Sequence, residues 1–350
     1  MKKIFLFASL MVCLGICGTH AQEIAFTDPV YDMVKDGHHL YAATKSGVVC
    51  YDAEKKSYSV ATLPDSLADE NLRSVDCKNG EVYVGLYNGH VLKLNGNDYE
   101  YVGTVPDKIL HKLRLDNDSN LYACARSLYK KTDEGWTQYK LPDSEISSTL
   151  SIYDACVDKD GAMWLAGRVL LGGAYRYDGE KISLILEIMG YAISVAADDA
   201  GKVWFGSMTK GLYLVENGTQ TNNFTMTNSS LKEREIAAIC TDADGTMWCG
   251  RNYLHHYADG DFTAYPMPAD VAINSLVAID GIVYIGTNSG IYTFANGEIS
   301  KLKFRTNAIK NTTSVSTQNN GAYTLQGIKL NNDMLRSGNV YIQNGKKIVR

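Results

Sequence analysis

Short apolar segments alternate with turn residues along most of the chain, and one arrangement recurs at a nearly constant spacing. Its clearest copy is 242–250, where an Asp-Gly turn is followed by Met-Trp-Cys-Gly. Segments 158–167 and 198–206 repeat it, and 79–85 and 280–286 carry Tyr in place of Trp. The turn closes at positions 37, 80, 119, 161, 201, 245 and 281, a period of about 40 residues that predicts a repeat fold.

Each repeat predicts four short strands. An apolar strand such as 236–241 leads into the Asp-Gly turn, and the second strand carries the aromatic residue. A loop leads to a third strand, as in 211–215 or 290–294, and an Asn-Gly or Asp-Gly turn introduces the fourth, as in 296–302. Four antiparallel strands per period form one blade of a β-propeller. We therefore predict an all-β fold, a seven-bladed β-propeller of four-stranded antiparallel blades over 22–304, plus a small C-terminal β element.

The repeat resembles a known family. Apolar positions, the Asp-x-x-Gly turn, the Trp-apolar-Gly strand and a following Gly-apolar-x-x-Tyr/Phe strand are similar to the two-component regulator propeller repeat over residues 31 to 304. That family includes sensor domains of hybrid two-component systems and stand-alone secreted propellers. The resemblance implies a propeller that recognises a ligand, either by itself or as a sensor that acts through a partner protein.

The first residues are typical of an export signal. Lys2 and Lys3 precede an apolar run from Ile4 to about Gly18, and small residues follow near Ala21. This pattern predicts a secretory signal peptide over 1–21. Since no later stretch has the apolar length to cross a bilayer, we expect no transmembrane span. The expected location is periplasmic, outer-surface or extracellular in a Gram-negative bacterium.

The last residues differ from the repeats. A Thr/Asn/Ser-rich stretch predicts a polar linker over 305–322, and 323–350 carries two strand patterns around Asn-Gly turns. Segment 323–350 resembles a type A sorting signal of the type IX secretion system. The resemblance rests on the motifs Leu-x-Gly, Gly-x-x-Tyr-Ile, Asn-Gly and Lys-Lys and on the β-branched residues near the C-terminus. The resemblance implies secretion machinery as a partner. A hairpin packed on the propeller is the alternative.

Charge narrows the choice of partners. The whole chain has a net charge of −5, but Lys2 and Lys3 contribute +2 and 301–350, with nine Lys or Arg and only Asp333, contributes +8. Residues 22–300 therefore carry −15. An acidic propeller repels phosphate backbones, and nucleic acid is therefore not an expected partner.

Candidate chemistry is sparse. The Asp-x-Asp-Gly turns are too short to wrap a calcium ion, and no CxxC or nucleophile motif is present, so we expect no metal, no cofactor and no catalytic residue. Six cysteines beyond the signal segment are expected to be free thiols. Trp164, Trp204 and Trp248 share one register and predict a core position, while Trp136 is expected to be partly exposed.

The loops between second and third strands vary most, and propellers bind ligands at loops around the channel mouth. Three arginines follow second strands, and three arginines on one rim could hold a carboxylate or sulfate. The predicted ligand-binding residues are Arg126, Arg168, Arg251, Lys45, Tyr87, Lys210, Tyr253 and Asn288. The alternative is that each arginine pairs with a local carboxylate and only braces its loop.

The preferred hypothesis is a secreted, non-enzymatic ligand-binding or scaffold propeller that recognises a carbohydrate, peptide or other anionic ligand at the channel mouth. One alternative is a lyase or lactonase acting on a carbohydrate-like substrate. Another is a periplasmic ligand sensor acting through a partner protein. Fold alone does not choose among them.

Overall fold

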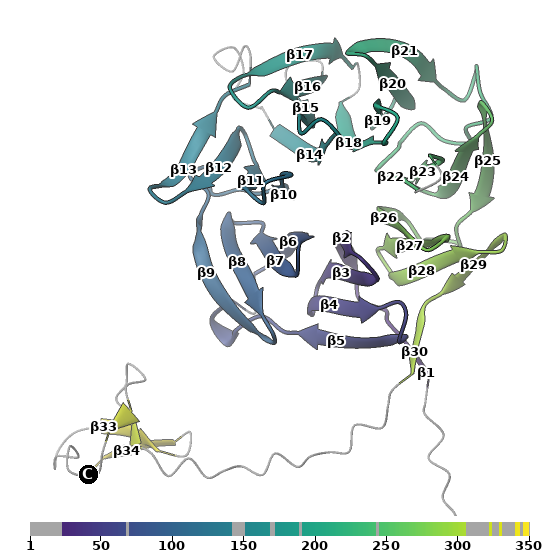
Figure 1. Ribbon diagram of the computed structural model, residues 1–350. Coiled ribbons are helices and arrows are strands. Elements are labelled where there is room, and N and C mark those ends of the chain that lie inside the picture. The colour runs from purple at the N-terminus through teal and green to yellow at the C-terminus, as the bar shows by residue number, and fades with distance from the viewer. Residues whose placement is uncertain are drawn as a thin grey trace, which may run out of the picture. The chain divides into compact units, whose positions relative to one another are not determined.

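Seven four-stranded antiparallel sheets form a ring around a central opening in this computed structural model (Figure 1). The structure describes residues 23–67, 70–141, 151–168, 172–188, 191–242 and 245–305, and strands at 322–323, 329–330, 340–343 and 346–349. Within each sheet the strands follow sequence order, so every repeat builds one blade. First strands face the opening and fourth strands lie at the rim (Figure 1). The predicted seven-bladed, all-β propeller is confirmed.

The strands of each blade follow directly from the sequence pattern. Blade 1 consists of β2 (Val30–Asp36), β3 (His39–Thr44), β4 (Gly47–Asp52) and β5 (Ser57–Ala61). Blade 2 consists of β6 (Leu72–Lys78), β7 (Glu81–Leu86), β8 (His90–Asn95) and β9 (Asp98–Thr104). Blade 3 consists of β10 (Lys112–Leu115), β11 (Leu121–Cys124), β12 (Leu128–Thr132) and β13 (Gly135–Tyr139). Blade 4 consists of β14 (Ser151–Val157), β15 (Met163–Arg168), β16 (Gly173–Tyr177) and β17 (Ile182–Glu187).

The remaining three blades also consist of four consecutive strands each. Blade 5 consists of β18 (Ala192–Ala197), β19 (Lys202–Ser207), β20 (Leu212–Glu216) and β21 (Thr219–Phe224). Blade 6 consists of β22 (Ala238–Thr241), β23 (Met247–Gly250), β24 (Tyr253–Ala258) and β25 (Asp261–Pro266). Blade 7 consists of β26 (Ile273–Ile279), β27 (Ile282–Thr287), β28 (Gly290–Ala295) and β29 (Glu298–Lys301). A 3-10 helix, η1 (Asp65–Leu67), precedes blade 2. No helix within the described ranges has the length and apolar character to cross a membrane.

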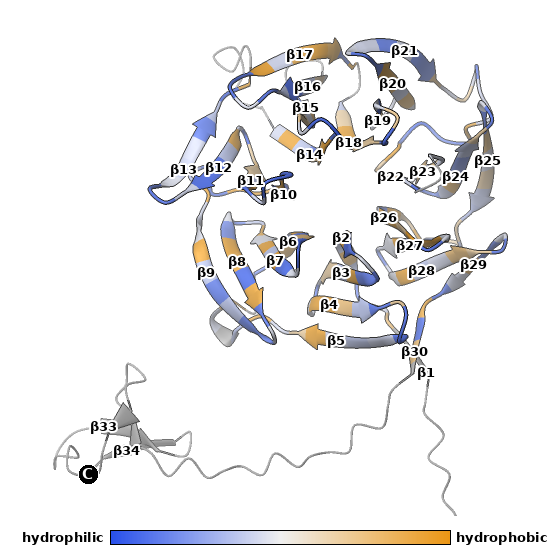
Figure 2. Ribbon diagram, viewed as in Figure 1, coloured by the Kyte–Doolittle hydropathy of each residue, from blue (hydrophilic) through white to orange (hydrophobic). Residues whose placement is uncertain are grey.

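The hydrophobic core lies between neighbouring blades. Trp164 of blade 4 packs with Val195 and Phe205 of blade 5, and Trp204 packs with Met247 of blade 6. Trp248 packs with blade 7 residues in the same way. Figure 2 shows hydrophobic residues concentrated in the strands and hydrophilic ones in the connecting loops. The three tryptophans are at most 6% exposed, which confirms their predicted core position, and Trp136 is partly exposed as predicted.

The glycine that ends the second strand allows blades to approach closely. A Cβ built on Gly206 would lie too close to the Ile236 carbonyl oxygen of blade 6 and to the Ser194 hydroxyl. At the equivalent Gly85, the obstacle is the side chain of Leu110, which can move. Backbone cannot move in this way without shifting the neighbouring blade.

We therefore expect Gly206→Ala to destabilise the propeller by about 1–3 kcal/mol, because overpacking pushes blade 6 away from blade 5. Gly85→Ala should cost less. Urea unfolding of both variants and the wild type measures the difference. If Gly206→Ala loses no more stability than Gly85→Ala, the blades tolerate a methyl group between them.

The ring closes between blade 7 and blade 1. Met33 N–H donates to the Ser275 hydroxyl at 3.0 Å, and the Asn274 side chain donates to the Val30 carbonyl at 2.8 Å. Outside the blades, β1 (Glu23–Ala25) pairs with β30 (Lys303–Arg305). Phe304 of β30 pairs with Ile24 and is buried in the core between blades 1 and 7. Both ends of the propeller segment thus stabilise the same joint.

The C-terminal residues form a separate compact unit. Its described strands are β31 (Ala322–Tyr323), β32 (Lys329–Leu330), β33 (Val340–Gln343) and β34 (Lys346–Val349), arranged as β32-β31-β33-β34. The predicted small β element is thereby confirmed. The predicted signal peptide and almost all of the predicted linker lie outside the described residues.

Candidate functional site

The first strand of each blade begins with residues that reach the central opening. In five blades the register between first and second strands shifts near this point. The residues at the shift are Tyr31, Arg73, Tyr153, Ile193 and Asn274. A β-bulge bends a strand and redirects a side chain, and all five residues line the central cavity.

This cavity, here called the mouth cavity, has a volume of about 490 Å³. It lies where the first strands begin. The last residues of the second strands lie on the same side, because first and second strands are antiparallel. In blade 4, Ser151 at the start of β14 pairs with Arg168 at the end of β15, and Val157 at the end of β14 pairs with Met163 at the start of β15. Its lining consists of Tyr31, Asp32, Met33, Arg73, His111, Lys112, Arg114, Tyr153, Asp154, Ile193, Val195, Met208, Ala237, Ala238, Ile239, Arg251, Asn274, Ser275 and Leu276.

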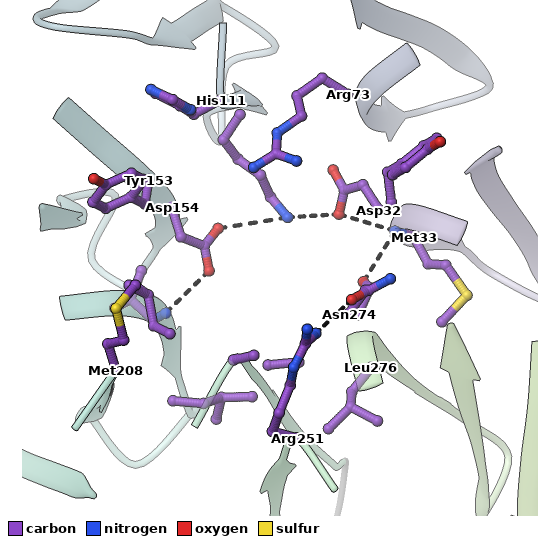
Figure 3. Close-up of a pocket in the computed structure, with 18 of the residues that line it drawn as sticks. Asp32, Met33, Arg73, His111, Tyr153, Asp154, Met208, Arg251, Asn274 and Leu276 are labelled. Carbon is purple, nitrogen blue, oxygen red and sulfur yellow. Dashed lines mark hydrogen bonds and ion pairs between the residues drawn. The ribbon is translucent and has the colours of Figure 1, made fainter. Parts of the chain in front are cut away.

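A network of ion pairs crosses the cavity. Lys112 of β10 lies between two carboxylates, with its Nζ 2.6 Å from Asp32 Oδ1 and 3.5 Å from Asp154 Oδ1 (Figure 3). Behind it, an Arg114 nitrogen lies 3.4 Å from Asp154 and another lies 3.7 Å from Asp76. Blade 3 is thereby tied to blades 1, 2 and 4 through charged groups.

Burial and neighbouring charge set the state of these carboxyls. Burial raises the pKa of Asp32, but Lys112 and Arg114 outweigh it and hold that pKa below its ordinary value. Burial is also the largest influence on Asp76, and there it exceeds the attraction of Arg114, so the pKa of Asp76 is raised. Asp32 is therefore ionised at neutral pH and forms a true ion pair with Lys112.

The same strand positions join the blades by hydrogen bonds. Asp32 Oδ2 accepts from Val75 N–H at 3.1 Å, and Asp154 Oδ2 accepts from Val195 N–H at 3.0 Å. Ser74 provides the corresponding acceptor for blade 3. A polar residue of one first strand thus satisfies an N–H of the next blade. These residues hold the wall of the mouth cavity in place.

Two arginines extend toward the middle of the mouth cavity from opposite sides (Figure 3). Arg251 is engaged: its Nη1 donates to the Asn274 side chain at 2.6 Å and to the Ile273 carbonyl at 2.8 Å, and its Nε lies 3.5 Å from Glu235. Arg73 is exposed and has neither a hydrogen bond nor an ion pair to any residue in the described part of the chain. Its guanidinium donors remain available to a ligand.

His111 lies beside Arg73 in the wall. Neither ring nitrogen has a hydrogen-bond partner among the described residues, although both are buried. Burial, assisted by the charge of Arg73, lowers the pKa of His111 to about 4. Its ring packs against Tyr153 with centroids 5.2 Å apart. At neutral pH, His111 is therefore an uncharged ring in the cavity wall.

The structure brings one of the predicted binding residues into the mouth cavity. Of the eight, all of which are described, Arg251 lines it and the other seven do not. Arg168 stacks on Tyr191 at 4.5 Å. The exposed Asn288 braces the preceding loop through Ala272 and Asp270. Lys45, Tyr87, Arg126 and Lys210 are exposed loop residues, and Tyr253 donates its N–H to Glu233.

Sequence reasoning missed Arg73, His111 and Lys112. A signal was present, since a charged residue interrupts the start of an otherwise apolar first strand, as in Asp32 and Asp154. Interpreted on a propeller, such a residue faces the channel and not the core.

Candidate metal ligands do not cluster in the described ranges. There, no group of three or more His, Cys, Asp or Glu side chains lies close enough to hold a metal ion. The six described cysteines are free thiols, as predicted. The mouth cavity instead offers one unengaged cation, one neutral imidazole and two tyrosines, a set suited to binding.

Comparison with known proteins supports the fold. No protein-family model matches the chain, and no curated protein sequence matches it. Among solved structures, the extracellular domain of the putative hybrid two-component system BT4673 from B. thetaiotaomicron is similar, with a TM-score of 0.59 and 17% identity over 78% of this chain. This chain spans only 40% of that one.

Two further structures are similar over most of their length. The WD40 β-propeller domain of Doa1 has a TM-score of 0.63 and 14% identity, covering 78% of this chain and 95% of its own. A catalytically inactive virginiamycin B lyase from Staphylococcus aureus with quinupristin has a TM-score of 0.57 and 15% identity, covering 69% and 86%. At such identities the similarity establishes a propeller and leaves the function to the site.

Proposed function

We propose that this chain is an exported, non-enzymatic ligand-binding propeller whose site is the mouth cavity. The observation that supports it is Arg73, a cation without a hydrogen-bonded partner in the described structure, set at the opening of a preformed cavity of about 490 Å³. Ligand sites are concave, largely preformed and supplied with a few polar groups that fix orientation. Arg73 supplies the charge, and His111 and Tyr153 line the cavity beside it.

The ligand therefore carries an anionic group that binds Arg73. Arginine presents a planar fork of donors that matches a carboxylate in two hydrogen bonds. Lys112 and Arg114 already share the carboxylates of the cavity wall, and Arg251 is held by blade 7 and Glu235. The wall is rigid because it consists of strand residues bonded to the next blade, so little order is lost when a ligand binds.

Arg73→Gln tests the site. We expect the variant to fold as the wild type does, since Arg73 is exposed and lacks described partners, and to lose at least tenfold in affinity for organic acids that bind the wild type. Calorimetric titration with a panel of carboxylates measures this. Arg126→Gln is the matched control, because Arg126 is an exposed arginine outside the mouth cavity. Equal loss in both variants, or no loss in Arg73→Gln, would exclude the mouth cavity as the site.

We also propose that residues 323–350 direct delivery and do not stabilise the propeller. Supporting observations are their separate sheet, the sorting-signal resemblance and the basic charge of 301–350. Deletion of 307–350 should shift the melting temperature by no more than about 2 °C, within the range of surface changes. Surface or extracellular delivery in a type IX secretion host should fall. Unchanged delivery would assign the segment another role.

A further inference from the structure

The mouth cavity has two chemically different halves. Blades 1 to 4 contribute almost only polar and charged side chains, among them Arg73, His111 and Tyr153. Blades 5 to 7 contribute mainly apolar ones, namely Ile193, Val195, Met208, Ala237, Ala238, Ile239 and Leu276. Figure 3 shows Arg73 and His111 on one side of the opening and Met208 and Leu276 on the other. A ligand that fills the cavity touches both halves.

Part of the apolar half is open to the cavity, although Val195, Ala238 and Leu276 are buried. Met208 is 42% exposed, one of five large hydrophobic residues that are at least 40% exposed among the described residues. Ile193 is partly exposed because the bulge turns it away from the core and toward the cavity. Covering such side chains removes apolar surface from water and favours binding. Hydroxyl-rich ligands gain nothing from this half.

Local charge limits the ligand to a single anionic group. Lys112, Arg114 and Arg251 are positive, and they are matched by Asp32, Asp76, Asp154 and Glu235. These seven groups carry a formal charge of −1, and Arg73 brings the total to zero. A polyanion would bring several charges to a neutral site and would leave all but one unpaired, which is costly in a concave, partly dehydrated cavity.

We infer that the ligand of the mouth cavity is a small amphipathic monocarboxylate. Its carboxylate binds the Arg73 guanidinium, and its aliphatic or aromatic body lies over Ile193 and Met208. The uncharged ring of His111 lies beside Arg73 in the wall and adds no competing charge. This inference rests on the proposed function and specifies the ligand class. The volume of the cavity agrees with it, since small-molecule sites span about 300–1,000 Å³.

Three probes separate the contributions of charge and apolar surface. Octanoate has one carboxylate and an aliphatic chain, octanamide has the same chain without the charge, and glucuronate has the carboxylate on a polar body. Calorimetric titration of the full protein should give the highest affinity for octanoate, with octanamide and glucuronate each at least tenfold weaker. Arg73→Gln should weaken octanoate at least tenfold and leave octanamide nearly unchanged. The double variant Ile193→Ser, Met208→Ser should weaken octanoate and octanamide alike.

The outcomes distinguish this inference from the proposed function. If glucuronate binds more tightly than octanoate and loses affinity in Arg73→Gln, the mouth cavity remains a site and the amphipathic class is wrong. If octanoate binds equally well to the wild type, Arg73→Gln and the double variant, its binding is adventitious and the inference is overturned. If none of the probes binds the wild type, both the inference and the anion-binding proposal are wrong. Melting curves of each variant confirm that the changes leave the fold intact.

Discussion

A protein that begins at residue 70 should not fold cooperatively. This truncation removes blade 1 together with β1, and it leaves two apolar faces uncovered. On blade 7, Tyr284 and Ile291 lose the packing of blade 1, and on blade 2, Val75 and Val84 lose it as well. Blades pack only on their neighbours, so an open ring exposes both faces to water and to other chains. We expect aggregation or a broad, non-cooperative thermal transition.

Calorimetry of the truncated and complete proteins at equal concentration measures this effect. Deletion of 307–350 is the control, because it also shortens the chain but removes residues only from the separate C-terminal unit and leaves all seven blades. A truncated protein that melts cooperatively at the wild-type temperature would contradict closure of the ring through blade 1.

Lys112→Met should destabilise the propeller by about 3–5 kcal/mol, the usual cost of removing one partner from a buried ion pair. Asp32 is only 1% exposed and ionised, and without Lys112 its carboxylate keeps Ser74 and backbone N–H donors but loses its adjacent cation. Asp154 loses the same partner at 3.5 Å. Urea unfolding at pH 7 measures the change.

Lys93→Met provides the control for this prediction. Lys93 also pairs with a carboxylate, but its partner Glu81 is 49% exposed, and exposed pairs contribute only about 0–1 kcal/mol. A loss in Lys112→Met as small as that in Lys93→Met would show that the cavity network is solvated and does not hold the blades together.

The repeat pattern predicted the blades, because turns and strands are determined by residues that lie close together in the sequence. Gly37, Gly161 and Gly245 all adopt positive φ at the first turn of their blades, where glycine carries no steric penalty. Trp204 was predicted to be buried because its register recurs. The pairing of β1 with β30 was not predictable, because it joins segments about 280 residues apart that carry little pattern of their own.

The candidate site was harder to predict, and the reason is geometric. Second strands lie one strand spacing, about 4.7–4.9 Å, farther from the channel axis than first strands. Residues at or after the ends of second strands, such as Arg126 and Arg168, therefore start farther from the mouth cavity than Arg73 and His111. Arg251 reaches the cavity because Asn274 and the Ile273 carbonyl of blade 7 direct its guanidinium inward. Such tertiary contacts leave no mark in a single sequence.

A crystal structure of the protein with octanoate tests the central claim most directly, because it shows where the ligand lies. The predicted result is a carboxylate hydrogen-bonded to the guanidinium of Arg73, with the aliphatic chain against Ile193 and Met208. Octanoate bound only at the outer loops near Arg126 or Arg168, with the mouth cavity holding solvent alone, would contradict the assignment of the mouth cavity as the binding site.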